Sequence, residues 1–507
     1  MRSGKLLIFN TSVLTIGTIL MRSISVFFNV YLTNRIGSAG IGLFQLITTV
    51  YGLFITFASG GVKLGATRLV SESELSDNDR TNSVMNICIK YALTAGSIAA
   101  ILLFIFSGIV SDKWINDERA TVSLKILSLS LPCVAVSAAL SGFFTAQKTM
   151  AKFSIVQLSE QVVRILITII TIALFGTDNT ERACSAVALG ITVSELFSML
   201  VSYSLFKSQS KSRLHHDTNI LKKLLHISIP ELTGSGCRAV LLTVEHILIP
   251  IGFKKSGYNT ENAMSIYGYI HGMALPIILY PSSFVSSLSS MLVPELSQIK
   301  AKNNSEKIST VCKTSIRFAI LFSFGAAAFF FFFSEYVSVV VYKDNSAAFY
   351  IRLLSVLIPV MYCDMITDGL LKGLDEQEAS MRYNIIDSAI CVVLVAVLVP
   401  NYSVSGYIFV LFLSEIINFS LSINRLIKRI GISVDLINDI LKPLYCALLS
   451  CGITYSLVLQ LFALPGNSII VFVLCIISFI AMYTCTLICS GCINQTEKTK
   501  LGSLIKN

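Results

Sequence analysis

Long apolar segments make up most of this chain and restrict the folds that it can adopt. A helix needs about 20 apolar residues to cross the hydrocarbon core of a bilayer. Charged residues make up only 13% of the chain, whereas soluble domains carry about 25%. We therefore predict an all-α polytopic membrane protein with about 14 transmembrane helices, at residues 6–32, 41–62, 86–110, 121–145, 154–176, 183–206, 223–252, 263–293, 311–342, 347–372, 382–400, 405–427, 439–462 and 468–490.

Lysine and arginine are distributed unevenly between alternate connections. The two terminal segments and the connections on their side hold 25 basic residues, against 7 in the connections on the other side. Basic connections stay in the cytoplasm, so both termini of this multi-pass protein are predicted to lie on the cytoplasmic side of the cell membrane. These loops account for the net charge of +10, and we expect no nucleic-acid partner.

Two short signatures occur twice at nearly the same spacing. Residues 125–142 and 352–369 both run from a basic residue through Leu-Ser and Pro to Gly, at an offset of 227. Residues 69–72 and 292–295 both read Leu-Val-x-Glu, at an offset of 223. A repeat of six spans follows, and its two copies should be related by an axis along the membrane normal.

The repeat predicts how the chain is divided. The first lobe would take residues 1–206 (spans 1–6), and the second would take 223–430 (spans 7–12). A cytoplasmic loop at 207–222 would join them, and 431–507 would hold spans 13 and 14 and a cytoplasmic tail. Cargo would then bind between the lobes, near the middle of the membrane.

Polar residues inside the first spans are candidates for binding a cargo. One helical face of the first run carries six of them, Thr11, Thr15, Thr18, Arg22, Ser25 and Asn29. A guanidinium is costly at this depth, so Arg22 should face the protein interior or a water-filled cavity, where its planar shape suits a phosphate. A second stripe in span two includes Gln45. Hydroxyl stripes of this kind also serve as interhelical hydrogen bonds. Arg68, at the inner end of span two, could meet either lipid or cargo.

Ionisable residues in later spans give further candidates. Arg238 and Glu245 are two turns apart in span seven, so each should find partners on other helices or in the cargo. His271 in span eight could contact cargo or carry a proton. Asp364 and Asp368 share a face of span ten and could bind a coupling cation, or lie hydrated near the cytoplasmic end.

Other charged residues suggest structure more than transport. Glu160 and Arg164 are one turn apart in span five and are expected to pair with each other. Weaker candidates for function are Glu195, Arg317, Asp387 and Glu415.

Catalytic motifs are absent from the sequence. It contains no GxxxxGK[ST], HExxH or GxSxG pattern. The connections on the less basic side are also short. We therefore expect no enzyme activity, no cofactor and no metal centre.

Two segments resemble a known family. Residues 267–281, YGYIHGMALPIILYP, continue to LVPE at 292–295 and resemble the eighth-span signature of the polysaccharide flippase family. Residues 37–46, GSAGIGLFQL, resemble the start of its second span. The family belongs to the multidrug/oligosaccharidyl-lipid/polysaccharide exporter superfamily, and the resemblance extends over the whole chain.

The resemblance implies a flippase whose lobes alternate between inward-open and outward-open states. Its cargo would be a polyprenyl-diphosphate-linked saccharide, such as a peptidoglycan precursor for spore cortex. In lipid II flippases, arginines in a central cavity engage the cargo diphosphate. Arg22 matches the place of such an arginine, Arg238 is a looser match, and Glu245 falls where relatives often carry an acid.

The resemblance also implies partners for the chain. Membrane lipids would contact it, and the last two spans of lipid II flippases form a groove for the lipid tail, which is a possible role for spans 13 and 14 here. A monovalent cation and cell-wall synthesis enzymes are further candidate partners.

Three other functions stay open from the sequence alone. The first is a cation-coupled multidrug exporter of the same superfamily, although such exporters usually have twelve spans. The second is a membrane ligase or polymerase of lipid-linked glycans, which the short outer connections disfavour. The third is a non-transporting scaffold for cell-wall enzymes, which the charges inside the spans disfavour.

Overall fold

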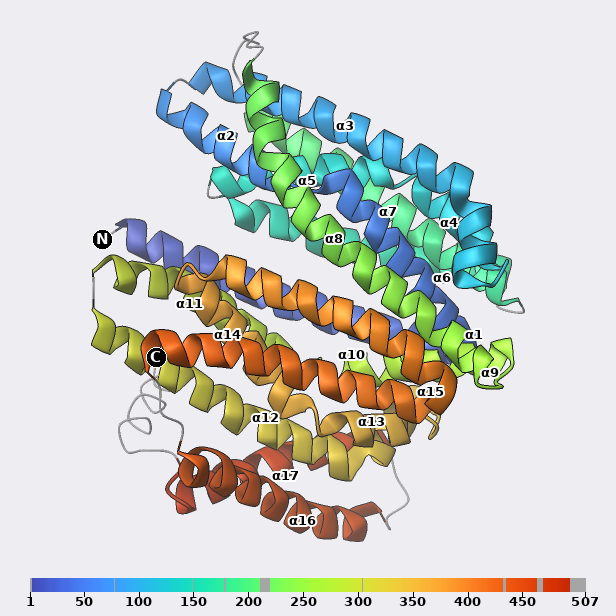
Figure 1. Ribbon diagram of the computed structural model, residues 1–507, viewed down its shortest axis with the longest axis vertical. Coiled ribbons are helices and arrows are strands. Elements are labelled where there is room, and N and C mark those ends of the chain that lie inside the picture. The colour runs from blue at the N-terminus through green and yellow to red at the C-terminus, as the bar shows by residue number, and fades with distance from the viewer. Residues whose placement is uncertain are drawn as a thin grey trace. The chain divides into compact units, whose positions relative to one another are not determined.

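The structure is a computed structural model that describes the backbone of most of the chain. The residues outside the description are 1, 77, 148, 177–178, 210–218, 303, 432–434, 463–467 and 493–507. The description also leaves out a further set of side chains, chiefly within 2–19, 74–80 and 458–469. Every described element is a helix (Figure 1). The all-α prediction is confirmed. Helices are expected because the hydrocarbon of a bilayer cannot hydrogen bond to the backbone.

The described chain forms two compact units, residues 1–268 with 388–410 and residues 269–387 with 411–507. Unit 1 contains α1 (Arg2–Ser59), α2 (Val62–Ser76), α3 (Asn78–Ile109), the π-helix η1 (Val110–Ile115), α4 (Ala120–Ser128), α5 (Leu131–Ala146), α6 (Met150–Phe175), α7 (Thr180–Gln209), α8 (Asn219–Lys255), α9 (Thr260–Tyr267) and the middle of α15 (Gln377–Ile430).

Unit 2 begins within the π-helix η2 (Gly268–Ala274). It continues through α10 (Leu275–Ile278), α11 (Ser282–Ala301), α12 (Ser305–Tyr342), α13 (Ala348–Ser355), α14 (Ile358–Gly373), both ends of α15, the π-helix η3 (Leu436–Leu441), α16 (Lys442–Phe462) and α17 (Ser468–Cys489).

Two of the helices are too long for a single crossing. Among the described residues, nine helices could span a membrane, or twelve if each of three bent pairs forms one span. Two of the nine run for 54 residues and contain Gly37 and Ser403, whose dihedral angles are non-helical. The chain turns back after Ser403 and brings Gly406 close to Leu398. A Cβ on Gly406 would lie 2.5 Å from the Leu398 carbonyl oxygen. Reading each long helix as two spans would give fourteen, a number that stays a prediction.

The first sequence signature marks the same break in both units. The bend between α4 and α5 is 45°, and the bend between α13 and α14 is 56°. Both breaks begin after a serine, Ser128 and Ser355, at the 227-residue offset of the signature. The second helix of each pair carries proline at its start, where the missing N–H breaks no hydrogen bond.

The glycine of each signature lets a neighbouring helix come close. A Cβ on Gly142 would lie 2.6 Å from the Lys63 carbonyl oxygen in α2, and one on Gly369 would lie 3.0 Å from the Ser289 carbonyl oxygen in α11. Spans two and four in unit 1, and spans eight and ten in unit 2, therefore pack alike. This supports a six-span repeat, whereas the lobe boundaries and the axis stay predictions.

The last two helices pack on α12 (Figure 1). The Tyr483 hydroxyl on α17 donates to the Leu321 carbonyl at 2.7 Å, and the same ring covers Gly325. Arg317 on α12 donates to the Cys492 carbonyl at 2.5 Å, and its Nε lies 3.8 Å from the carboxylate of Asp439. Arg317 thus holds both the segment before α16 and the segment after α17 on one helix.

This contact predicts that Gly325→Val destabilises unit 2. A Cβ at Gly325 would lie 2.6 Å from the Tyr483 ring, and overpacking of this kind costs about 1–3 kcal/mol. Gly452→Val in α16 is the matched control, because nothing lies within 4 Å of its Cβ position. We expect the thermal unfolding midpoint in detergent to fall for the first variant only. Equal midpoints would contradict the packing.

Candidate functional site

The polar stripe of the first run lies on α1, and part of it can be followed. The side chains of Thr11, Thr15 and Thr18 lie outside those described. Arg22 and Asn29 are half-buried, and both interact with their surroundings. Ser25 accepts a hydrogen bond from the Gln161 amide of α6 at 3.1 Å. This face of α1 therefore meets other protein groups at a polar surface, as Arg22 requires at membrane depth.

The other predicted cargo residues of unit 1 lie on three different helices. Gln45 on α1 is half-buried, whereas Arg68 on α2 and Arg238 on α8 are exposed. α1 packs against α8, so Arg22 and Arg238 belong to neighbouring helices of one compact unit. Their joint contact with a cargo stays a prediction.

Glu245 is buried in a polar cluster between α8, α9 and α15. Its side chain is 9% exposed, and its charge interacts with the fully buried hydroxyls of Tyr267 and Tyr407. Tyr267 also hydrogen bonds with His246 Nδ1 at 2.7 Å and with Thr49 of α1. The sequence pattern did not identify the two tyrosines, since each looks like an ordinary apolar span residue.

Unit 1 contains a second group of charges, centred on Arg164 of α6. Its guanidinium lies 2.7 Å from Glu160 and 3.1 Å from Glu195 of α7, and it also donates to Ser194 at 3.2 Å. The predicted Glu160–Arg164 pair is confirmed. The side chains are only 16–23% exposed, so two carboxylates share one cation in a poorly solvated place.

Unit 2 contains a group of carboxylates on α14 and α15. Asp364 accepts from the Asn418 amide at 3.2 Å, and Asp387 accepts from the Ser414 hydroxyl at 2.9 Å. Glu415 lies close enough for its charge to interact with both aspartates. Asp364 Oδ1 is buried without a hydrogen-bond partner among the described atoms. A group of this kind attracts a cation or a proton.

Asp368 lies one turn from Asp364 on α14 and differs from it in having a cation as its partner. Asp368 forms an ion pair with Lys372 at 2.6 Å and accepts from the hydroxyl of Ser380. Its side chain is 27% exposed. Asp368 is therefore already neutralised, and Asp364 is the better candidate for an exchangeable cation. Ser414 and Asn418 are spaced one turn apart in span twelve, which is the signal that could have identified them.

His271 lies within η2, which turns as a π-helix. The hydroxyl of Tyr342 donates to the Met273 carbonyl at 2.9 Å in the same segment. π-Helical turns free backbone carbonyls and are common at functional sites. His271 is half-buried and interacts with its surroundings, and its contact with cargo stays a prediction.

Comparison with known proteins places the chain in a family. The family model described as "Polysaccharide biosynthesis protein" matches residues 7–300, more than half of the sequence. This chain belongs to that family. The MatE family model also matches, over residues 257–398.

Individual relatives extend over most of the chain. Stage V sporulation protein B of Bacillus subtilis is 22% identical over 442 residues, which cover 85% of each chain. The solved lipid II flippase MurJ in its inward closed conformation covers 93% of this chain and 97% of its own, with a TM-score of 0.72 and 13% identity. An inward-facing multidrug resistance MATE transporter covers 83% of this chain and 100% of its own, with a TM-score of 0.64 and 14% identity. The chain therefore shares the fold of these membrane transporters.

The shared guanidinium of unit 1 predicts a strong effect of Arg164→Met. The change leaves Glu160 and Glu195 facing each other without a cation, and breaking a buried pair in this way costs about 3 kcal/mol. Adding Glu195→Gln should restore part of the loss by removing one of the two charges. Thermal unfolding in detergent measures both variants.

The control is Arg382→Met, which removes an exposed pair with Glu378 of the same i,i+4 spacing. Its expected effect is small, because exposed pairs contribute about 0–1 kcal/mol. A fall in the unfolding midpoint as large as that of Arg164→Met would contradict the distinction between the two pairs.

Proposed function

We propose that this protein moves a polyprenyl-diphosphate-linked saccharide across the cytoplasmic membrane by alternating access. The main support is the match to stage V sporulation protein B along 85% of the chain, together with a fold shared with a lipid II flippase. A peptidoglycan precursor, used for example in spore cortex, is the cargo that these two names favour. Both termini would lie in the cytoplasm, and no covalent chemistry would be needed.

Arg22 and Arg238 would hold the cargo diphosphate. A guanidinium offers paired N–H donors that match phosphate oxygens. Arg22 is half-buried in an apolar helix. Arg238 is exposed on α8, where a phosphate group could reach it. Asn29, Gln45, Arg68 and His271 would contact the saccharide or headgroup, and the lipid tail would stay in the bilayer.

The carboxylates would couple transport to a monovalent cation or a proton. Asp364 with Asp387 and Glu415 in unit 2 is the stronger candidate, because several acids are held there by amide and hydroxyl groups. Glu245 is the candidate in unit 1. Asp368 would have an indirect part through its pair with Lys372.

A cation-coupled multidrug exporter is the second candidate. The MatE match at residues 257–398 and the MATE fold favour it. The lipid II flippase covers 93% of this chain and the MATE transporter 83%. This difference favours the flippase, because two helices beyond a twelve-span core would account for it.

The flippase proposal predicts that Arg22→Ala abolishes transfer of a polyprenyl-diphosphate saccharide. Loss of charged hydrogen bonds to a phosphate weakens binding by about tenfold or more. Purified protein in proteoliposomes would be tested with a fluorescent cargo, whose transfer an impermeant quencher reports. Arg22→Lys should keep part of the rate, and Arg182→Ala, which alters an exposed residue, should keep all of it. Failure of the wild type to transfer this cargo, with a drug substrate moving instead, would favour the exporter.

The coupling proposal predicts that Asp364→Asn makes transfer insensitive to cation and proton gradients. The neutral amide keeps the shape of the site but no longer attracts a cation. In the same assay, wild type should respond to a Na⁺, K⁺ or pH gradient, and the variant should transfer at its gradient-free rate. Asp375→Asn is the control, because that carboxylate is 76% exposed and pairs with Lys300. An unchanged gradient response in Asp364→Asn would overturn the assignment.

A further inference from the structure

The 227-residue repeat extends backwards from the two bends into the helices that precede them. Residues 104–108 in α3 read FIFSG, and residues 331–335 in α12 read FFFSE. The offset is the one that relates Lys125 of α4 to Arg352 of α13. The two copies therefore match closely here, except that the last residue is glycine in unit 1 and glutamate in unit 2.

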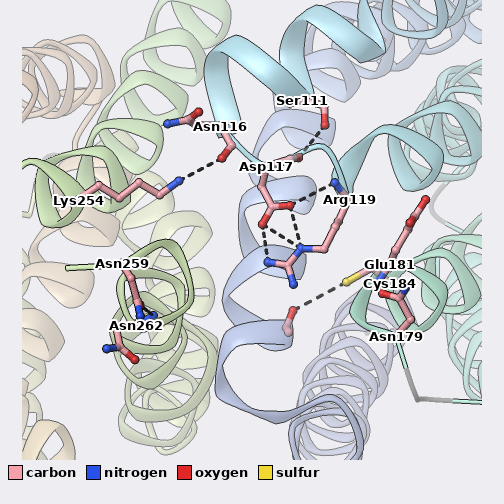
Figure 2. Close-up of polar contacts among 11 residues, drawn as sticks. Ser111, Asn116, Asp117, Arg119, Asn179, Glu181, Cys184, Lys254, Asn259 and Asn262 are labelled. Carbon is pink, nitrogen blue, oxygen red and sulfur yellow. Dashed lines mark hydrogen bonds and ion pairs between the residues drawn. The ribbon is translucent and has the colours of Figure 1, made fainter.

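Hydrogen bonds near the ends of these helices give the same register. The Ser111 hydroxyl donates to the Asp117 carbonyl at 2.7 Å in unit 1, as Figure 2 shows. At the same offset in unit 2, the Ser338 hydroxyl donates to the Asp344 carbonyl. The residue before each aspartate has a positive φ angle, 59° in unit 1 and 56° in unit 2. Equivalent positions of the repeat thus occupy equivalent places within each unit.

In unit 2 the basic residue of the repeat has an acidic partner. Arg352 Nη2 lies 2.9 Å from the Glu335 carboxylate, and Arg352 Nε donates to the Ser334 hydroxyl at 3.1 Å. The two charged side chains are 46% and 60% exposed. This part of the surface of unit 2 therefore carries a neutral pair.

In unit 1 the corresponding lysine has no acidic partner. The Lys125 ammonium lies 5.8 Å from the centre of the Phe104 ring, which is a weak attraction at an exposed site. Within the part of the chain that the structure describes, no carboxylate pairs with it. Gly108 stands where unit 2 has the glutamate, and nothing lies within 4 Å of its Cβ position. Unit 1 thus has a lone cation beside an open place.

Exposed apolar side chains surround this lysine. Val122 and Leu129 lie one turn before and after it on α4 and are 42% and 63% exposed, and Ile105 of α3 is 64% exposed. An apolar surface of this kind on membrane-spanning helices faces lipid. Lys125 lies about 7.5 Å from the start of α4 at Ala120. From that depth a lysine can extend its ammonium to the headgroup region while its stem stays among apolar groups.

We propose that Lys125 binds the phosphate of an anionic phospholipid in the leaflet on the less basic side. The phosphate takes the place beside Gly108 that a carboxylate takes in unit 2. Lysine binds phosphate as a point charge, and the acyl chains lie on the apolar side chains around it. This apolar surround favours a lipid over an acidic protein. The inference does not depend on the identity of the cargo.

A native fluorophore can report lipid binding at this place. Trp114 is the only tryptophan of the chain. It is 43% exposed in η1, six residues after Gly108, so its fluorescence is quenched by brominated lipids at this end of α3. The full chain would be reconstituted in vesicles of phosphatidylcholine and phosphatidylglycerol, with one of the two lipids brominated at a time. Wild type should prefer phosphatidylglycerol about fivefold, as expected for one lysine near a membrane surface.

Variants at two positions test the assignment from opposite directions. Lys125→Met should lower the preference to about one, and Lys125→Arg should keep it. Gly108→Glu keeps the lysine but supplies the carboxylate that unit 2 has, so it should also abolish the preference. Lys113→Met is the matched control, because it removes an exposed lysine from the same connection and should leave most of the preference.

Equal quenching by the two brominated lipids in wild type would overturn the proposal. A preference that persists in Lys125→Met or in Gly108→Glu would overturn it too. An equal loss in the Lys113 and Lys125 variants would show diffuse attraction by the whole connection in place of a site. The assay contains no cargo, so failure of saccharide transfer in proteoliposomes would remove the flippase proposal and leave this site intact.

Discussion

Everything in this structure depends on satisfying polar groups where water is absent. Hydrocarbon offers the backbone no hydrogen bonds, so the described chain is helical throughout. The breaks obey the same constraint. Where proline interrupts spans four and ten, Ser128 donates to the Lys125 carbonyl at 2.7 Å, and Ser355 donates to the Arg352 carbonyl at 2.6 Å. The serine and the proline of the repeated signature thus act together. The serine donates to a carbonyl at the end of the first helix, and the proline starts the second helix.

Both units contain these helix breaks, but their buried charged residues have different partners. In unit 1, Arg164 lies between Glu160 and Glu195, so a cation of the protein itself pairs with both carboxylates. In unit 2, Asp364 and Asp387 are held by an amide and a hydroxyl, which hydrogen bond to a carboxylate but do not neutralise it. Repetition of the backbone therefore does not repeat the electrostatics. The difference is why we assign cation coupling to unit 2 and treat the Arg164 group as structural.

Local signals in the sequence predicted the all-helical fold well, and distant partners poorly. The length of an apolar segment and the repeated proline can each be recognised within a single span. Glu160 is one helical turn from Arg164, so their pairing can also be predicted locally. The partner of Arg164 on α7, Glu195, is 31 residues away, and no local pattern reveals it. The compact units differ from the predicted lobes for another reason. Residues 219–268 and 388–410 lie with unit 1, because compact units are defined by contacts in space, whereas the sequence repeat follows the order of spans along the chain.

The final helix pair bears on the choice between flippase and exporter. α16 and α17 pack on α12, through hydrogen bonds to backbone carbonyls and through Gly325. The Tyr483 hydroxyl and the Arg317 guanidinium donate to backbone carbonyls, and the Tyr483 ring packs on Gly325. The MATE transporter fold covers 83% of this chain, and the lipid II flippase fold covers 93%. A cargo with a long lipid tail needs a surface beside the lobe along which the tail can lie. Under our proposal, α16 and α17 beside α12 would supply that surface.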